Sequence, residues 1–235
     1  MLCVPAACAV RWWTVAEQQA WRAAPTGPPE FANCIGAVDA TYIELQRPKD
    51  PVLERRVYST YKKMHAIFFI AVIDREGERG GEVMSRCSSG ADRSHLLIIV
   101  RLLSRVCAGC FRFIDKGNTP LGSSEAMAFA AADIFLMQDM RILGDTAYRS
   151  DKRCRAPFIA PEYDPARVDA ATCRARKAYN HRHSNVRIRV EHAFSRVKHT
   201  WRLLQSQWRF PLARLPPTFR ACCLLANWIH IERGL

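Results

Sequence analysis

The run from Ala66 to Ile73 constrains the fold most, because every residue in it is apolar. It is short, rich in β-branched and aromatic side chains, and followed directly by the polar sequence Asp74–Gly77. A run of this kind is typical of a strand that is buried on both faces. We therefore predict that it lies in the middle of a sheet, with other elements covering it on either side.

Further strands are expected on both sides of this run in the sequence. Residues 34–46 alternate between apolar and polar up to Pro48, which predicts a second strand. Residues 141–148 predict a short strand followed by a turn. The polar and basic segment Arg55–Lys63 favours a loop or an edge strand over a core strand, and residues 157–165 carry the prolines of a loop.

Helices are predicted mainly in the second half of the chain. The candidates are Leu96–Val106, Ser123–Gln138, Arg167–Tyr179, Asn185–Leu204 and Phe219–Ile231. The fourth has the clearest pattern, since apolar residues recur every three to four positions and form one buried stripe. That stripe consists of Val190, Phe194, Val197, Trp201 and Leu204. Strands followed by helices around a buried strand indicate a mixed α/β domain.

The domain organisation is expected to be simple. Residues 1–33 are interpreted as a lead-in without a fold of its own, whose tryptophans pack on the domain, with a linker at residues 24–29. Residues 34–235 then form a single domain, because 235 residues suffice for one well-cored unit and leave little for a second.

Several classes of protein are disfavoured. The ten cysteines are scattered and no secretory signal precedes them, so reduced thiols are expected rather than a disulfide framework. Cys107–Cys110 is a CxxC, but it lacks a second ligand pair at the spacing of a zinc site. No run reaches the roughly 18 apolar residues of a membrane span. We therefore expect a soluble intracellular protein without a membrane partner.

Charge suggests a polyanionic partner. The formal net charge is +13, and nucleic acid is the first candidate because neutralising phosphates releases counterions. A basic surface that is merely solvated is the alternative. Between Arg174 and Arg202 the basic residues are dense and Glu191 is the single acid. We predict DNA-phosphate contacts from Lys62, Lys63, Arg182, Arg187, Arg189 and Lys198.

Three carboxylates stand out in this basic chain. Asp39 lies on the first strand, Asp145 follows Gly144 at a strand end, and Glu191 lies at the edge of the helical stripe. Carboxylates are the ligands that Mg²⁺ prefers, and two such ions can promote phosphodiester hydrolysis. The alternative is structural: an Asp at a strand end often caps a turn, and Glu191 could pair with Arg187 on a solvated surface.

Longer sequence motifs favour the first interpretation. They are Gly36–Ile43 with Pro48, Tyr61–Ala66, Leu143–Tyr148, Ala156–Phe158, Asn180–Lys198 and Ala221–Asn227. In this order they resemble the DDE nuclease domain of PIF/Harbinger-type transposases. The resemblance implies an RNase H-like mixed sheet flanked by helices. It also implies that Asp39, Asp145 and Glu191 are the catalytic residues and the ligands of Mg²⁺ or Mn²⁺.

The resemblance has three departures. Residues 78–140 match poorly, Ala40 stands where the family usually has glycine, and 33 residues leave no room for the family's amino-terminal DNA-binding region. Two hypotheses follow. The first is a metal-dependent DNA endonuclease of transposase descent that uses a two-metal mechanism, acts in the nucleus or also in the cytoplasm, and works with a separate DNA-binding protein. The second is an inactive, truncated or domesticated copy that binds DNA or a protein.

Overall fold

The structure is a computed structural model, and it describes residues 12–25, 28–59, 62–74, 98–99 and 135–232. The helices predicted at Leu96–Val106 and Ser123–Gln138 fall almost entirely outside these residues, as does the cysteine pair at 107–110. The same is true of most of the divergent segment 78–140.

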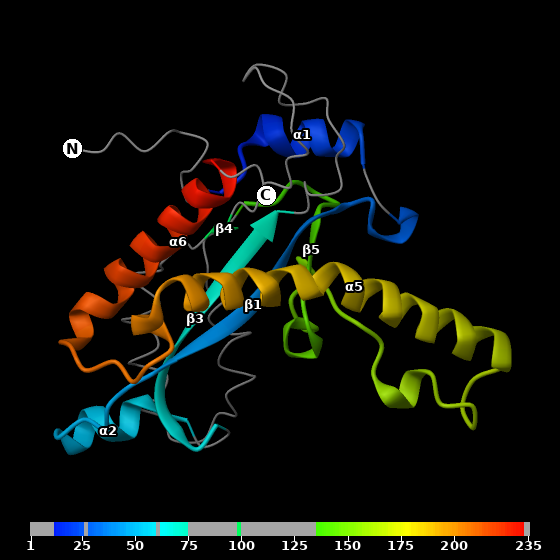
Figure 1. The fold of residues 1–235 in the computed structure, drawn as a ribbon. Coiled ribbons are helices and arrows are strands. Elements are labelled where there is room, and N and C mark those ends of the chain that lie inside the picture. Colours follow the sequence, from blue (N-terminus) through cyan, green and yellow to red (C-terminus); the bar gives the residue numbers. More distant parts are fainter. Residues whose placement is uncertain (1–11, 26–27, 60–61, 75–97, 100–134, 233–235) are drawn as a thin grey trace.

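One mixed sheet organises the described part of the chain (Figure 1). Its strands are β1 (Cys34–Glu44), β2 (Tyr58–Ser59), β3 (Met64–Asp74), β4 (Ile98–Ile99), β5 (Arg141–Leu143) and β6 (Cys154–Arg155). The order across the sheet is β2-β3-β1-β5-β6, and β4 pairs with β3 beside this path. The pairs β1–β3, β2–β3 and β3–β4 are antiparallel, whereas β1–β5 and β5–β6 are parallel.

Strand β3 is the predicted central strand, and the prediction is confirmed. It pairs with β1 from Gly36 opposite Asp74 to Glu44 opposite Ala66, and with β2 and β4 on its other side. Phe69 packs in the apolar cluster on one face of the sheet and Val72 in the cluster on the other. Burial on both faces accounts for the unbroken apolar run.

The helices are α1 (Val15–Ala23), α2 (Pro51–Val57), α5 (Ala170–Thr200) and α6 (Leu215–Glu232). Short 3₁₀ turns cover Pro29–Phe31, Thr146–Tyr148, Ala160–Glu162, Arg202–Leu204 and Leu212–Arg214. The described helices and sheet form the expected α/β architecture, which is consistent with an RNase H-like fold. None of these helices, within the described residues, combines the length and the apolar character that crossing a membrane requires.

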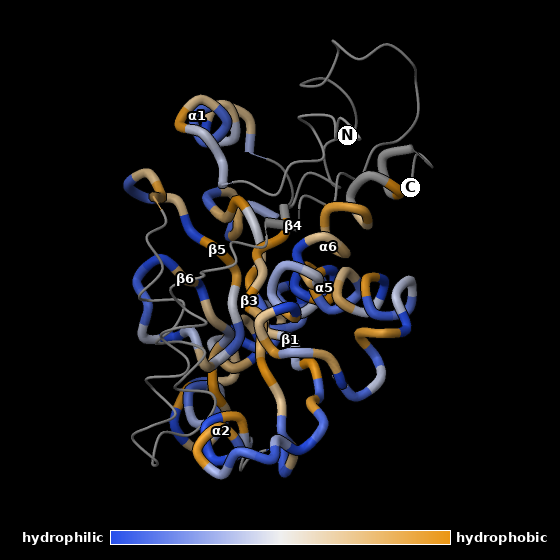
Figure 2. Tube along the Cα trace, turned by 90° about the vertical axis from the view of Figure 1, so that its left-hand side faces the viewer, coloured by the Kyte–Doolittle hydropathy of each residue, from blue (hydrophilic) through white to orange (hydrophobic). Residues whose placement is uncertain are grey.

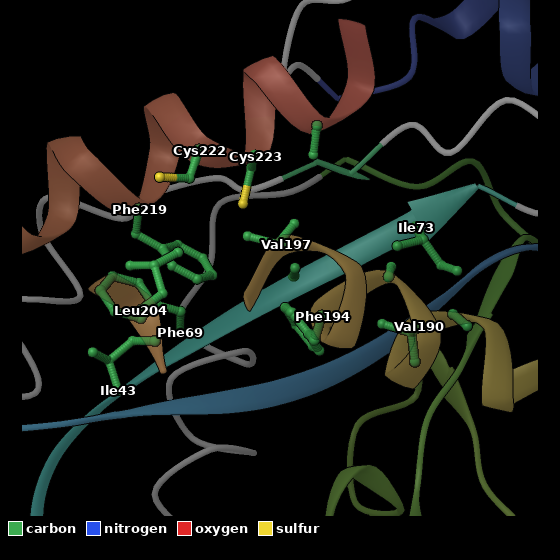
Figure 3. Close-up of a cluster of buried hydrophobic side chains, with 14 of the residues drawn as sticks. Ile43, Phe69, Ile73, Val190, Phe194, Val197, Leu204, Phe219, Cys222 and Cys223 are labelled. Carbon is green, nitrogen blue, oxygen red and sulfur yellow. The ribbon is translucent and has the colours of Figure 1, made fainter. Parts of the chain in front are cut away.

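Helices α5 and α6 cover one face of the sheet and enclose the larger apolar cluster (Figure 3). The predicted stripe supplies Val190, Phe194 and Val197 to this cluster, all buried. Phe219 of α6 stacks on Phe69 of β3 with ring centroids 4.2 Å apart. In Figure 2 the apolar residues concentrate on the strands in the middle of the molecule, while the helices mix apolar and polar positions. The stripe therefore fixes which side of α5 faces the sheet.

Helix α1 lies on the opposite face, where Trp13 and Trp21 pack against the sheet. Trp21 also donates from Nε1 to the carbonyl oxygen of Ala32 at 3.1 Å. A capping box starts the helix: Glu17 N–H donates to Thr14 Oγ1 at 3.2 Å, and Thr14 N–H donates to Glu17 Oε2 at 2.7 Å. The prediction that the early tryptophans pack on the domain is confirmed for these two.

Three predicted boundaries were wrong. Helix α5 is continuous across 180–184, where a break between two helices was expected. Helix α2 extends into the start of Arg55–Lys63, which was expected to be a loop or an edge strand, because the Asp50 side chain caps the helix and Pro51 suits its first turn. The edge strand expected in that segment is present as β2. Helix α6 begins at Leu215, so its two prolines lie within the first turn, where their missing N–H groups cost no helical hydrogen bond.

Candidate functional site

Parallel pairing of β1 with β5 brings Asp39, in the middle of β1, near Asp145, which follows the end of β5. Ala37 of β1 lies opposite Leu143 of β5, and each aspartate follows its partner by two residues. Ala37 and Leu143 both belong to the cluster beneath α5 and α6. Because strand side chains alternate between faces, Asp39 also points to the α5 side of the sheet.

Local contacts explain the shape of the turn that carries Asp145. Asp145 Oδ1 accepts a hydrogen bond from the N–H of Ala147 at 2.8 Å and so caps the 3₁₀ turn Thr146–Tyr148. Tyr148 is fully buried, and a Cβ on Gly144 would lie 2.9 Å from the Tyr148 Cβ. Glycine is therefore required for the close approach of this turn. The sequence had offered a turn cap as the alternative role of Asp145, and this cap is present.

Arg187 of α5 joins the other two carboxylates. Its Nη1 donates to Asp39 Oδ2 at 3.1 Å, and its Nη2 donates to Glu191 Oε1 at 2.5 Å. The Arg187 and Asp39 side chains are only 22% and 18% exposed, whereas Glu191 is 47% exposed. An ion pair between Glu191 and Arg187 was the predicted alternative to metal binding, and this pair is present. Arg187 also pairs with Asp39, and this second contact links α5 to β1.

Electrostatics tie all three carboxylates together. Burial raises the pKa of Asp39, and the negative charges of Asp145 and Glu191 add to the rise. The Ala40 N–H, which donates to Asp39 Oδ1 at 2.9 Å, and the Arg187 guanidinium lower the pKa of Asp39 and offset part of this effect. A buried carboxylate surrounded by like charge favours a cation beside it.

His183 is a site residue that sequence reasoning missed. It is 1% exposed, and its Nε2 lies 3.0 Å from the carbonyl oxygen of Arg155, to which it donates. Burial lowers the pKa of His183 and Arg187 lowers it further, while the Arg155 carbonyl and Asp145 oppose the shift. The signal was available in the sequence, because His183, Arg187 and Glu191 are spaced by four residues and so share one helix face.

Asn180, one turn earlier on α5, brackets the backbone of Phe158. Its Nδ2 donates to the Phe158 carbonyl oxygen at 2.9 Å, and its Oδ1 accepts from the Phe158 N–H at 2.8 Å. Asn180 and His183 thus both hold the chain that leaves β6. They set the position of α5 along the sheet, and hence the position of Glu191 relative to the two aspartates.

The three carboxylates fit a divalent metal in their chemistry. They are hard oxygen donors, and two of their oxygens, on Asp39 and Glu191, meet at a single guanidinium. In this arrangement Arg187 supplies the positive charge. Within the described ranges, no group of three His, Cys, Asp or Glu side chains is arranged to hold a metal ion. Arg187 thus occupies oxygens of two of the three carboxylates, those of Asp39 and Glu191.

The six basic residues predicted to contact DNA differ in how they are engaged. Arg182 forms an ion pair with Glu30, and Arg187 binds Asp39 and Glu191. Lys198 donates from Nζ to the Tyr42 carbonyl oxygen at 2.8 Å. Three of the six predicted contacts are thus engaged within the protein.

The remaining basic residues leave more charge at the surface. Lys62 and Lys63 are exposed, and the Lys62 Nζ lies 5.6 Å from the centre of the Tyr42 ring. Lys198 approaches the backbone of the same tyrosine, so two ammonium groups gather at Tyr42 on β1. Burial lowers the pKa of Lys198. Arg189 is partly buried on α5.

Sequence comparisons show which family the chain matches. The sequence model of a family described as DDE superfamily endonuclease matches residues 98–227, more than half of the chain, including Asp145 and Glu191. The Arabidopsis thaliana protein "Antagonist of Like Heterochromatin Protein 1" is 25% identical over 198 residues, which is 84% of this chain and 44% of that protein. The chain thus spans less than half of this relative's length. No solved structure matches the chain.

Proposed function

Because the chain belongs to the DDE superfamily endonuclease family, we propose that it is the metal-dependent DNA endonuclease domain of a transposase-derived protein. The observation that carries this proposal is the pairing of β1 with β5. In this pairing Ala37 lies opposite Leu143, Asp39 and Asp145 each follow two residues later, and Glu191 is connected to Asp39 through Arg187. The net charge of +13 suits a polyanionic substrate.

The three carboxylates act together in this proposal. Asp39, Asp145 and Glu191 would together hold the Mg²⁺ or Mn²⁺ ions of a two-metal mechanism. Divalent metal bound there would activate the attacking water and stabilise the leaving oxygen of the phosphodiester. Asp145 also keeps its turn in shape through the Ala147 N–H, so its backbone position is fixed before metal arrives.

The basic residues supply DNA binding without reading sequence. Lys62, Lys63, Arg182, Arg189 and Lys198 would contact phosphates, which position a duplex but do not distinguish its bases. To bind phosphate, Arg182 would leave its ion pair with Glu30 and Lys198 would leave the Tyr42 carbonyl oxygen. A separate DNA-binding protein would then provide the target sequence. A DNA substrate places the proposed activity in the nucleus.

A second candidate function is a binding module that no longer cuts. Two observations favour it: the relative that matches most of this chain is named for antagonism of another protein, and Arg187 occupies the place between two of the carboxylates. In that case the domain would bind DNA or a protein partner and the acids would serve only its structure.

Nicking of supercoiled plasmid in the presence of MnCl₂ separates the two functions. We expect the protein to nick, and Asp145→Asn to abolish nicking, because the amide oxygen still caps the turn while the charge is lost. Asp164→Asn is the matched control, since Asp164 also caps a turn, through the Ala166 N–H at 3.0 Å, but does not belong to the triad.

The control should nick as the wild-type protein does. Equal nicking by Asp145→Asn would exclude the proposed site. DNA binding without nicking, at every Mn²⁺ concentration tried, would favour the binding module instead.

A further inference from the structure

Arg187 holds an unusual position among the basic residues of α5, because one guanidinium serves two members of the triad. Each of its terminal nitrogens donates to a different carboxylate, Nη1 to Asp39 and Nη2 to Glu191. The two acids come from different elements, β1 and α5. The fork therefore ties the helix to the sheet at the point where the carboxylates converge.

We propose that Arg187 is a built-in counter-ion of the triad, which holds Asp39 and Glu191 until a divalent cation binds and is then released to contact a DNA phosphate. This inference rests on the proposed nuclease function. A divalent ion would need the same carboxylate oxygens that Arg187 now occupies. Since two cations on one set of oxygens repel each other, metal binding and the Arg187 bridge exclude one another.

The surroundings of Arg187 support this exchange. Arg187 and Asp39 are both largely shielded from solvent at their contact, and arginine supplies a positive charge that is never lost by deprotonation. His183 and Asn180 hold α5 through Arg155 and Phe158 independently of Arg187. The helix thus keeps its place when the guanidinium leaves. A planar guanidinium also matches phosphate in two-point hydrogen bonding.

The alternative is that Arg187 is an ordinary i,i+4 ion pair that only stiffens the site. The two roles predict opposite changes in metal affinity when Arg187 is removed. If Arg187 competes with metal, its removal tightens metal binding. If Arg187 only holds the carboxylates in place, its removal loosens the site and weakens metal binding.

Isothermal titration calorimetry of the full chain with MnCl₂ measures whether the Mn²⁺ affinity rises or falls. We expect Arg187→Gln to bind Mn²⁺ on the order of tenfold more tightly than wild type, because the competing charge is gone. Without metal its melting temperature should fall, since two carboxylates lose their counter-charge, and Mn²⁺ should raise it by more than in wild type. Arg187→Lys, which keeps the charge but not the fork, should give intermediate values.

Arg182→Gln is the matched control, because it removes the same charge from the same helix and breaks an ion pair with Glu30, outside the triad. Its Mn²⁺ affinity should change by less than about twofold. Weaker or unchanged binding by Arg187→Gln would overturn the counter-ion role alone. If neither wild type nor Arg187→Gln binds Mn²⁺, the nuclease function falls together with it.

The release step has its own test. A labelled DNA duplex is titrated with protein in the presence and absence of CaCl₂, which fills oxygen sites, and binding is followed by fluorescence anisotropy. The loss of DNA affinity caused by Arg187→Gln should be several-fold larger with Ca²⁺ than without it. An equal loss under both conditions would overturn release to phosphate.

Discussion

At the residue scale, His183 shows how a buried polar group can serve the site without touching a carboxylate. Its imidazole is enclosed by the rings of Phe31 and Tyr179, and it donates to the Arg155 carbonyl. That carbonyl belongs to β6, the neighbour of the strand that leads to Asp145. His183 is thus a positioning residue rather than a catalytic one.

The lowered pKa of His183 predicts a pH dependence of stability. The folded protein holds the imidazole neutral, whereas the unfolded chain protonates it near its ordinary pKa of about 6.5. The contribution of His183 is therefore fully present above about pH 6.5 and is lost as the pH falls towards the folded pKa. Urea unfolding at about pH 7.5 and about pH 5 measures this loss.

His183→Gln should reduce this pH dependence, because the amide can still donate to Arg155 but does not titrate. His181→Gln is the control, since His181 is exposed on the same helix and should leave the dependence unchanged. An identical pH profile for His183→Gln and wild type would contradict the assignment.

At the element scale, α5 carries most of what makes the site. Its 31 residues rise about 46 Å, and its successive turns present Asn180, His183, Arg187 and Glu191 to the strands. The Asp169 side chain starts the helix by accepting from the N–H groups of Ala171 and Thr172, both at 2.9 Å. Lys198 and His199 lie in the last turn, where basic side chains interact favourably with the negative end of the helix dipole.

The bracket between Asn180 and Phe158 should matter for both stability and metal binding. Asn180→Ala removes two hydrogen bonds to a part-buried backbone, which we expect to cost about 2 kcal/mol in the free energy of unfolding. The Mn²⁺ affinity should fall as well, because Glu191 would no longer be held in a fixed position relative to the sheet.

Asn185→Ala is the comparison for this change, since Asn185 is exposed on the same helix and its Nδ2 lies 3.3 Å from the Nε2 of His181. Its unfolding free energy should change by less than about 0.5 kcal/mol. Chemical denaturation of the three proteins, followed by titration with MnCl₂, checks both effects. A stable Asn180→Ala variant with normal Mn²⁺ affinity would show that the bracket does not position the helix.

The elements were predictable from the sequence where periodicity is strong. The apolar run of β3 and the stripe from Val190 to Val197 identified a central strand and the buried side of α5. The polar stretch 180–184 has no such pattern, and tertiary contacts of Asn180 and His183 decide its helical state. The start of α2 was missed although Asp50 and Pro51 are ordinary start signals for a helix.

At the scale of the whole molecule, charge dominates the expected behaviour. A net charge of +13 predicts DNA binding that weakens steeply with salt. Lys62→Gln should reduce the slope of log K against log[KCl] by about 1, because one phosphate contact is lost. Lys49→Gln is the control, as Lys49 is exposed and lies outside the proposed contacts.

Fluorescence anisotropy of a DNA duplex over a range of KCl concentrations measures both slopes. Equal slopes for Lys62→Gln and wild type would remove Lys62 from the DNA-binding surface. A reduced slope for Lys49→Gln would instead indicate that binding depends on overall charge.

The candidate triad was named from the sequence through its resemblance to a family, since the spacing of three acids alone does not reveal that they converge. The proximity of Asp39 to Asp145 depends on the pairing of β1 with β5, two strands far apart in the sequence, which no local pattern encodes. The bridge from Arg187 to Asp39 was not predictable for the same reason. By contrast, the cap formed by Asp145 is local, and the sequence indicated it.

The long-range pairing of the site also has a consequence for how the protein is made. Ribosomes deliver the chain from its amino terminus, so the β1–β3 hairpin can form soon after its residues emerge. Parallel pairing of β1 with β5 must wait until residue 143 is present, and Glu191 arrives later still. A fragment released early in synthesis would lack the third acid. The proposed nuclease site would therefore be complete only once Glu191 has been added to the growing chain.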